Sequence, residues 1–248
     1  MVQKYTFEPI GYIQSPYKEK FAVPRQPGLV QDGAGTIKLA APYDHPDTVR
    51  DLDQFSHVWV IFAFHQIIDQ SWHPTVRPPR LGGNTHVSVF ATRSPFRPNK
   101  IGLSLIELSG IRIESDGVFL DLKSVDLVDG TPVLDIKPYL PFAESLPHAR
   151  AGFAKDAPRP QLETDFSQEA LATLLTYQEH YPQLKRFISD VLNQDPRPAY
   201  KKEKQDDKAY AVRLLEFDVH WKVIGENNYV THITPIESKT EVLSKVES

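Results

Sequence analysis

Residues 57–67 read HVWVIFAFHQI and contain the longest apolar run of the chain, the seven residues at 58–64. A strand that is apolar at consecutive positions has no polar face to turn toward water. The stretch therefore predicts a central strand that is buried on both faces. A membrane-spanning helix needs about 20 apolar residues, so this run is too short to cross a bilayer.

Short strand patterns surround this stretch. Alternating or β-branched residues predict strands at 5–14, 36–40, 85–92 and 133–139, and a hairpin joins 111–113 to 118–122 through the turn ESDG at 114–117. The chain has 21 prolines and only 12 glycines, which suits stiff turns. Many short strands with proline-rich turns predict a mainly β protein with an N-terminal antiparallel β-barrel.

The pattern changes after the barrel region. Residues 140–161 hold four prolines and little periodicity, which indicates a linker. Helices are predicted at 166–181, with Asp165 or Ser167 as N-cap, and from Pro182 onward, and strands at 209–221 and 229–236 flank a turn at 225–228. The second helix carries an amphipathic stripe made of Leu184, Phe187, Ile188, Val191 and Leu192. We expect a barrel domain at 1–145 and a small α+β domain at 160–240.

Composition excludes several classes of protein. The 248 residues include no cysteine, so disulfides, cysteine–zinc sites, iron–sulfur clusters and cysteine nucleophiles are ruled out. The nine histidines show no zinc-ligand spacing, and we expect no metal site. No glycine-rich nucleotide loop stands between a strand and a helix, so a nucleotide-like cofactor is not bound in a Rossmann manner. The chain begins without a secretory pattern, and we expect a cytoplasmic protein with no membrane segment.

Charge is unevenly distributed along the chain. The net charge is −4, from 28 Lys and Arg against 32 Asp and Glu, yet the 37 positions from 70 to 106 contain no acidic residue. The same window carries five cations, namely Arg77, Arg80, Arg93, Arg97 and Lys100. This pattern indicates a surface that faces an anion or RNA, although a solvated loop with a chance charge bias would look the same.

Three segments are candidates for the functional site. The first, ATRSPFRPNKIG at 91–102, places two arginines four residues apart on a loop that Pro95 and Pro98 stiffen, which is a plausible ligand cradle. The second, at 126–139, holds Asp126, Asp129 and Asp135, whose spacing does not match a calcium loop. These carboxylates fit ribose or amine recognition, a metal site, or simply a turn with aspartate caps.

The third segment is DPRPAY at 195–200. Two prolines hold Arg197 extended, and Tyr200 and the lysines of 201–208 follow it. A presented arginine beside an aromatic ring and several lysines suits phosphate contact and base stacking. An ordinary linker at the end of a helix explains the pattern equally well.

Together these motifs resemble the TrmO family of tRNA methyltransferases. The resemblance is carried by FEPIGYI at 7–13 with Ser15-Pro16, PRQPG at 24–28, ATRSPFRPN at 91–99 with IGLS at 101–104, and residues 126–139, in the order of the family. It covers about residues 5–145, and DPRPAY at 195–200 resembles the family's C-terminal motif. Lys100 stands where the resemblance leads us to expect proline.

The resemblance implies a non-Rossmann barrel that binds S-adenosylmethionine and works as a homodimer. It implies methylation of N6 of N6-threonylcarbamoyladenosine at position 37, in the anticodon loop of threonine tRNAs. Transferred by motif, the cofactor-binding residues would be Arg93, Ser94, Pro95, Phe96, Arg97, Pro98, Asn99, Asp126, Leu127, Asp129, Gly130, Thr131 and Pro132. The catalytic residues on the tRNA side would be Asp195, Arg197 and Tyr200.

Simple chemistry suits this reading. Methyl transfer from a sulfonium is a direct displacement that needs alignment rather than a covalent nucleophile, so the absence of cysteine is no obstacle. Asp126 or Asp129 would bind the ribose hydroxyls or the amino group, and Arg93 or Arg97 the carboxylate of the cofactor. The target nitrogen loses a proton on methylation, and Asp195 or Tyr200 is the candidate base.

Two other functions compete with this one. A barrel that binds a nucleotide-like ligand and regulates a partner would bind without turnover. A hydrolase that acts through a metal at Asp126, Asp129 and Asp135 would lose its activity in a chelator.

Overall fold

The computed structural model describes residues 3–158, 160, 162–197 and 208–236. These residues divide into two compact units, the first made of the described residues in 1–15 and 24–159 and the second of those in 16–23 and 160–248. The predicted division at 1–145 and 160–240 does not include the segment 16–23 in the second unit. Its Tyr17 is fully buried there, and its ring lies 5.8 Å from that of Phe187.

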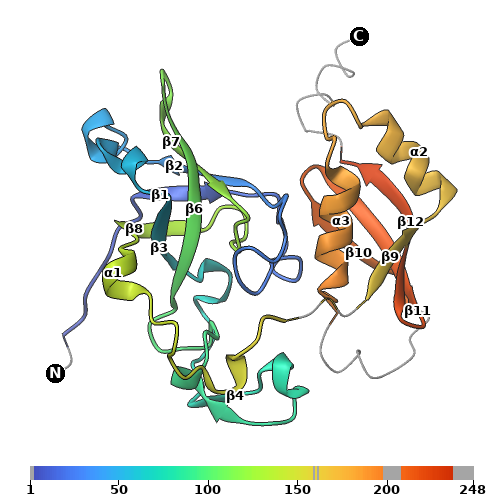
Figure 1. Ribbon diagram of the computed structural model, residues 1–248, viewed down its shortest axis with the longest axis horizontal. Coiled ribbons are helices and arrows are strands. Elements are labelled where there is room, and N and C mark those ends of the chain that lie inside the picture. The colour runs from blue at the N-terminus through green and yellow to red at the C-terminus, as the bar shows by residue number, and fades with distance from the viewer. Residues whose placement is uncertain (1–2, 159, 161, 198–207, 237–248) are drawn as a thin grey trace. The chain divides into compact units, whose positions relative to one another are not determined.

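The first unit is a closed antiparallel barrel of six strands, which confirms the predicted mainly β class. Its strands follow one another around the barrel in the order β1-β2-β7-β6-β3-β8, and β8 pairs with β1 to close it (Figure 1). Closure leaves no free sheet edge, which a small antiparallel sheet would otherwise expose. The strands are β1 Gly11–Gln14, β2 Gly35–Leu39, β3 His57–Ala63, β6 Ile101–Glu114, β7 Gly117–Lys123 and β8 Pro132–Pro138.

Strand β3 lies between β6 and β8, but only one of its faces is buried. Val58, Val60 and Phe62 point into the barrel, whereas the residues between them are partly exposed. The prediction of a strand buried on both faces is therefore wrong. A barrel strand has a packed inner face and an outer face, and here the outer face happens to be apolar.

Several local predictions were confirmed and others were too long. The hairpin at 114–117 joins β6 to β7, with Glu114 opposite Gly117. The stretch 85–92 forms only the two-residue strand β5 Val87–Ser88, paired with β4 Thr75–Val76, because the chain then turns into a 3-10 helix. The stretch 5–14 is a strand only over β1. The 3-10 turns of this unit are Pro46–Val49, Leu52–Gln54, His65–Ile67, Pro79–Leu81, Val89–Ala91 and Gly152–Ala154, and the predicted linker also contains the helix α1 Pro141–Glu144.

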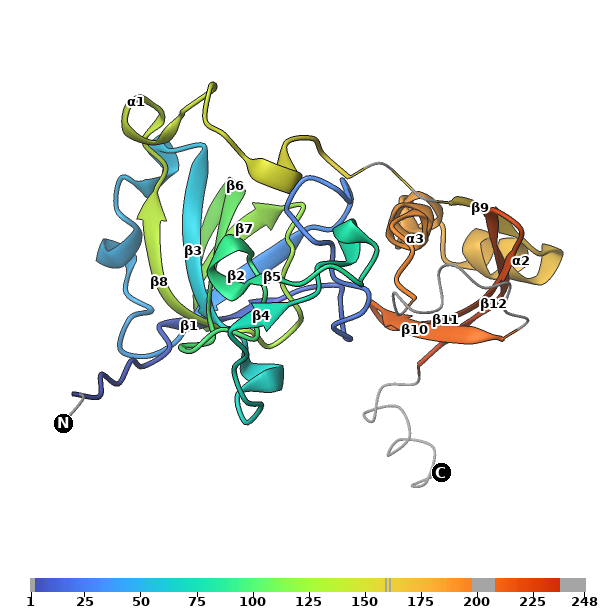
Figure 2. The same ribbon diagram turned by 90° about the horizontal axis from the view of Figure 1, so that it is seen from below.

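The second unit is a four-stranded sheet with two helices on one side of it (Figure 2). The order is β10-β11-β12-β9, and β9 runs parallel to β12. The helix α3 buries the whole predicted apolar stripe against this sheet, and Ser167 caps α2 by accepting a hydrogen bond from Ala170 N. The elements are β9 Glu163–Phe166, α2 Gln168–Thr176, α3 Leu184–Asn193, β10 Tyr210–Leu214, β11 Phe217–Ile224 and β12 Asn227–Pro235.

Two predictions for this unit are corrected. The helix expected at 166–181 is shorter, because Phe166 ends β9 and the chain turns after Thr176. The strand expected at 209–221 is two strands, since the chain reverses at Leu215, whose φ is +53°. Among the described residues no helix is long and apolar enough to pass through a membrane.

A close approach inside the barrel gives a test of this packing. A Cβ atom on Gly102 of β6 would lie 2.2 Å from Cζ of Phe62 on β3, whereas a Cβ on Gly110 of the same strand would lie 3.8 Å from its nearest neighbour. We expect Gly102→Ala to lower the free energy of unfolding by about 1–3 kcal/mol, because the Phe62 ring must move. Urea unfolding measures this. Gly110→Ala is the matched control, and an equal loss in both variants would contradict the packing described.

Candidate functional site

The strand register brings two of the predicted segments to one end of the barrel. Ala63 at the end of β3 pairs with Ile101 at the start of β6, and Phe62 pairs with Val133 near the start of β8. The loop 91–100 enters β6 at this end, and the segment 126–131 enters β8 at the same end. Residues far apart in the sequence are thus placed side by side by strand pairing.

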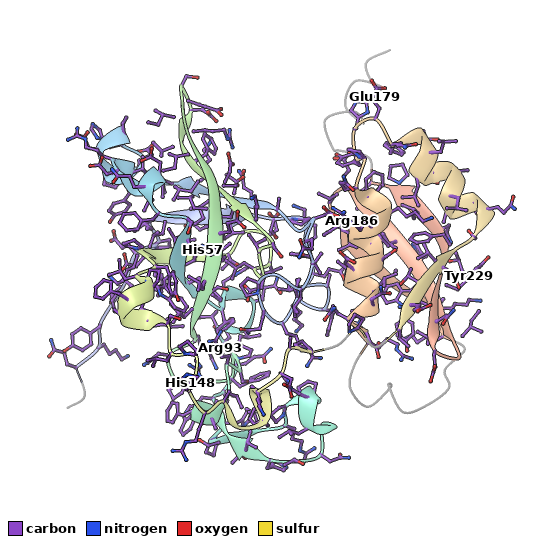
Figure 3. The ribbon with its side chains drawn as sticks, viewed as in Figure 1. His57, Arg93, His148, Glu179, Arg186 and Tyr229 are labelled. Carbon is purple, nitrogen blue, oxygen red and sulfur yellow. The ribbon has the colours of Figure 1, made fainter. Side chains whose placement is uncertain are left out.

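A third segment is tied to the same region. Gln26, from the PRQPG motif, accepts a hydrogen bond of 2.7 Å from the Arg93 guanidinium, and Gly28 N donates to Ser124 Oγ at 2.9 Å. Arg93 is exposed at this end of the barrel (Figure 3). The segments 24–28, 91–100 and 126–131 therefore converge on one place.

Asp126 is the carboxylate with the most unusual setting in this region. It is partly buried and accepts a hydrogen bond from the Ser104 hydroxyl of β6. It also interacts electrostatically with the positive charge of Arg93. Desolvation raises the pKa of Asp126 to about 6, although Ser104, a backbone hydrogen bond and Arg93 all act in the opposite direction. A carboxylate shifted toward neutral pH beside an exposed arginine is typical of a functional site.

Asp129 has a structural partner. Its carboxylate accepts a hydrogen bond of 2.8 Å from Ser15 N, and Ser15 Oγ donates to Leu127 O at 2.8 Å. The φ of Gly130 is +74°, which favours glycine, and Gly130 N donates to Ile13 O. These contacts fix the segment 126–131 against the end of β1.

Arg97 holds its own loop together. Its Nε donates to Ser94 O at 3.1 Å, and its Nη2 donates to Thr92 O at 2.8 Å and to Val89 O at 3.4 Å. Because one guanidinium binds three backbone carbonyls, it stabilises the conformation of this loop. Of the two arginines expected to meet the cofactor carboxylate, the geometry favours Arg93 for direct contact and Arg97 for positioning.

The other predicted residues of the two segments fill supporting places. Ser94 Oγ accepts from Phe96 N at 3.3 Å, and Phe96 O accepts from His73 N. Leu127 and Thr131 are buried, whereas Pro98 and Asn99 are exposed. Pro95 is partly buried, and Pro132 is the first residue of β8.

The aspartates do not assemble into a metal site. Asp126 meets Ser104, Asp129 meets Ser15, and Asp135 forms an ion pair of 2.8 Å with Lys137. Among the described residues no three His, Asp or Glu side chains gather where an ion would bind. The geometry therefore does not support the hypothesis of a hydrolase that acts through a metal held by these three aspartates.

Asp195 and Arg197 meet in the second unit. Both side chains are almost fully buried, with Arg197 Nε 2.8 Å from Asp195 Oδ1 and Nη2 3.1 Å from Oδ2. Asp195 itself has a φ of +50°. The pair fixes the start of the DPRPAY segment. Tyr200 and residues 201–207 lie outside the described residues.

The structure adds three residues to the predicted site: Ser15, Gln26 and Ser104. Each lies inside a motif that carries the family resemblance, but none has a side chain that by itself suggests chemistry. Their contacts to Asp129, Arg93 and Asp126 depend on tertiary structure, so the motif was the only signal in the sequence.

The residues present fit the polar groups of S-adenosylmethionine. A partly buried carboxylate such as Asp126 suits hydroxyl or amino donors, and the exposed Arg93 suits a carboxylate. The same region contains the buried amine of Lys100, whose Nζ has no hydrogen-bond partner among the described residues. Unmatched buried donors of this kind are expected where a ligand completes the site.

The fold and the geometry define a barrel that carries a candidate ligand site at one end and is followed by a small α+β unit. Residues 12–145 match the family "tRNA-methyltransferase O N-terminal domain", and residues 159–236 match "TrmO C-terminal domain". Together these matches cover well over half of the chain, and the chain belongs to the TrmO family.

Individual relatives agree with this assignment. The chain is 57% identical over 234 residues to the tRNA (adenine(37)-N6)-methyltransferase of Escherichia coli, covering 94% of this chain and 100% of that protein. It is 43% identical over 135 residues to the mouse enzyme of the same name, covering 54% of this chain and 30% of that one. A crystal structure of TrmO from Pseudomonas aeruginosa superposes with a TM-score of 0.76 at 37% identity, covering 94% and 99%.

The raised pKa of Asp126 predicts a pH-dependent stability. The folded protein retains this proton up to about pH 6, whereas the unfolded chain releases it near the ordinary value of 3.8. Stability therefore falls as pH rises from about 4 to about 6, and the whole penalty is present above that. We expect Asp126→Asn to be more stable than the wild type at pH 7.5, by up to ~3 kcal/mol, with no difference near pH 4.

Urea unfolding at pH 4, 6 and 7.5 measures this difference. Asp116→Asn is the control of opposite sign, because Lys38 lowers the pKa of Asp116 and its removal should slightly destabilise the protein at neutral pH. A gain for Asp126→Asn that is the same at all three pH values would show that ionisation is not its cause.

Proposed function

We propose that this protein transfers a methyl group from S-adenosylmethionine to N6 of adenosine 37 in tRNA. We further propose that the substrate base is N6-threonylcarbamoyladenosine in the anticodon loop of threonine tRNAs. The observation that carries the proposal is the convergence of residues 24–28, 91–100 and 126–131 at one end of the barrel, in a chain that belongs to the TrmO family. The cytoplasm, where tRNA and cofactor are both present, is the proposed compartment.

The cofactor supplies a methyl group already activated by a positive sulfur. We propose that Arg93–Asn99 and Asp126–Pro132 line its site, with Asp126 directed to ribose hydroxyls or the amino group and Arg93 to the carboxylate. Arg97 contributes to the cofactor site by stabilising the conformation of the loop, since its guanidinium already binds three backbone carbonyls there. Holding the acceptor nitrogen in line with the methyl carbon provides most of the catalysis in such a displacement.

The segment DPRPAY is proposed to serve the tRNA side of the reaction. Both oxygens of Asp195 accept hydrogen bonds from Arg197, so this carboxylate is better suited to positioning than to proton transfer. The buried pair fixes the described start of this segment, and Tyr200, the other predicted base, lies outside the described residues. The acid-free window at 70–106 and the lysine-rich segment 201–208 provide positive charge for the phosphates of the anticodon loop.

We also propose a homodimer that forms through the barrel. The outer face of β3 and β6 carries Leu103, which is 49% exposed and lies opposite Ile61. The neighbouring α1 carries Phe142, which is 90% exposed. Neighbouring exposed apolar side chains favour a protein interface.

Methyl transfer is tested directly with purified protein. Radiolabelled S-adenosylmethionine is incubated with threonine tRNA that carries threonylcarbamoyladenosine and with the same tRNA lacking that group. We expect label in the first tRNA only, and mass spectrometry of the anticodon fragment should show one added methyl on the modified base. Binding of S-adenosylmethionine without label in either tRNA would instead support the regulatory ligand-binding module.

Arg97 variants connect this activity to the loop. We expect Arg97→Ala to weaken cofactor binding by about 10-fold or more, since several charge-assisted hydrogen bonds to the loop are lost. Arg97→Lys should restore little of the lost cofactor affinity, because one ammonium group cannot reproduce the several hydrogen bonds of a planar guanidinium. If both variants bind the cofactor with the affinity of the wild type in calorimetry, Arg97 does not position the loop for cofactor binding.

The dimer is tested by light scattering. The expected mass is twice the 28.2 kDa of one chain. Leu103→Asp should shift the protein toward the monomer, because a buried, unpaired carboxylate opposes association. A monomeric mass for the wild type at every concentration would contradict the proposal.

A further inference from the structure

Lys100 adopts an unusual backbone conformation at the start of β6. Its φ is +49°, in the left-handed region that non-glycine residues rarely occupy, and its carbonyl accepts a hydrogen bond of 2.9 Å from Phe64 N. Proline, which the family resemblance led us to expect here, is locked at a negative φ. A residue retained in such a conformation beside a candidate site is a reason to look for a function.

The side chain of Lys100 is buried without a partner. The residue is 6% exposed, and its Nζ has no hydrogen-bond acceptor in the part of the chain that the structure describes. A buried amine without an acceptor is far more costly than a neutral group in the same state, so a partner is expected from outside the chain.

The carboxylates around this end of the barrel are already engaged. The window at 70–106, which contains Lys100, has no acidic residue of its own. On the adjoining segments Asp126 meets the Ser104 hydroxyl, Asp129 accepts from Ser15 N, and Asp135 pairs with Lys137. The acceptor for Lys100 is therefore sought in the ligand.

The surroundings favour a strong ion pair. Phe62 of β3 and Phe64, which follows this strand, lie with their ring centroids 5.0 Å apart. Phe62 also packs over Gly102, two residues after Lys100. Lys100 itself is only 6% exposed, and low contact with water strengthens an interaction between opposite charges. Arg97, the nearest arginine in the sequence, already binds loop carbonyls.

We propose that the ammonium group of Lys100 binds a ligand carboxylate at this end of the barrel. The carboxylate comes from the methionine end of S-adenosylmethionine, which Lys100 would then bind together with Arg93, or from the threonine group of the modified base. The second source rests on the proposed function, whereas the first needs only the cofactor. Lys100 then fixes the position of the ligand and takes no part in proton transfer.

The experiment compares the wild type with Lys100→Met, which retains the length of the side chain and removes the charge. Calorimetry gives the affinity for S-adenosylmethionine and for 5′-methylthioadenosine, which has the same nucleoside but a neutral thioether sulfur and no aminobutyrate chain, and therefore no carboxylate. A second titration uses an anticodon stem-loop that carries either threonylcarbamoyladenosine or unmodified adenosine. Lys38→Met, on the exposed surface of the same unit, is the control for loss of one lysine.

If the cofactor is the source, Lys100→Met should weaken S-adenosylmethionine binding by about 10- to 100-fold and leave 5′-methylthioadenosine within about twofold. If the modified base is the source, affinity should fall only for the stem-loop that carries threonylcarbamoyladenosine. Without ligand, the variant should unfold at a temperature no lower than the wild type, because an unpaired buried amine has been removed.

Three results would overturn the proposal: no change for any ligand, an equal loss for both members of each pair, or a similar loss in Lys38→Met. The cofactor titrations remain interpretable even if the wild type fails to methylate the modified tRNA. Failure of the proposed function and failure of this inference are therefore separate results.

Discussion

The pairing of β3 with β6 on one side and with β8 on the other is the constraint on which the site depends. This register places the ends of three strands together and brings the loop before β6 and the segment before β8 to one end of the barrel. Closure through β1 and β8 then adds the end of β1, whose Ser15 binds Asp129. A shift of one residue in β3 would turn Val58 and Val60 outward and separate these loops.

Charge within this region is arranged by partners from distant parts of the chain. Asp126 is held by Ser104, and Arg93 by Gln26, so each candidate contact with a ligand is fixed by a residue from another segment. Arg97 fixes the loop itself through its carbonyls. A methyl-transfer site needs such pre-arrangement because alignment, rather than a covalent nucleophile, provides the rate. Burial raises the pKa of Asp126 to about 6, and a carboxylate shifted in this way is typical of functional groups.

The two units are also linked by more than the segment near residue 159. Residues 16–23 leave the barrel after β1, belong to the second unit, and return to the barrel. Tyr17 is fully buried there, and Leu215 N donates to Pro16 O. The motif SPY at 15–17 therefore has two roles, since Ser15 fixes Asp129 in the first unit and Tyr17 completes the core of the second.

Local patterns in the sequence predicted some elements well. The apolar stripe of α3 and the turn at 114–117 depend on neighbours three or four residues apart, and both were confirmed. The stretch 85–92 alternates like a strand, yet most of it is not one, because only two of its residues find a partner strand. The apolar outer face of β3 was mistaken for a second buried face. Pairing between distant segments decided these outcomes, and local propensity does not encode it.

The sequence by itself determined the mainly β class, the amphipathic helix of the second unit, the absence of cysteine chemistry and the motifs of the TrmO family. The tertiary structure decided which motif residues meet, that Arg97 binds its own loop, and that Asp195 and Arg197 form a buried pair. It also decided that the amine of Lys100 is buried with no hydrogen-bond partner in the part of the chain that the structure describes. The physical reason is that composition and periodicity are properties of neighbouring residues. Hydrogen-bond partners and burial are set by the register of strands that lie far apart along the chain.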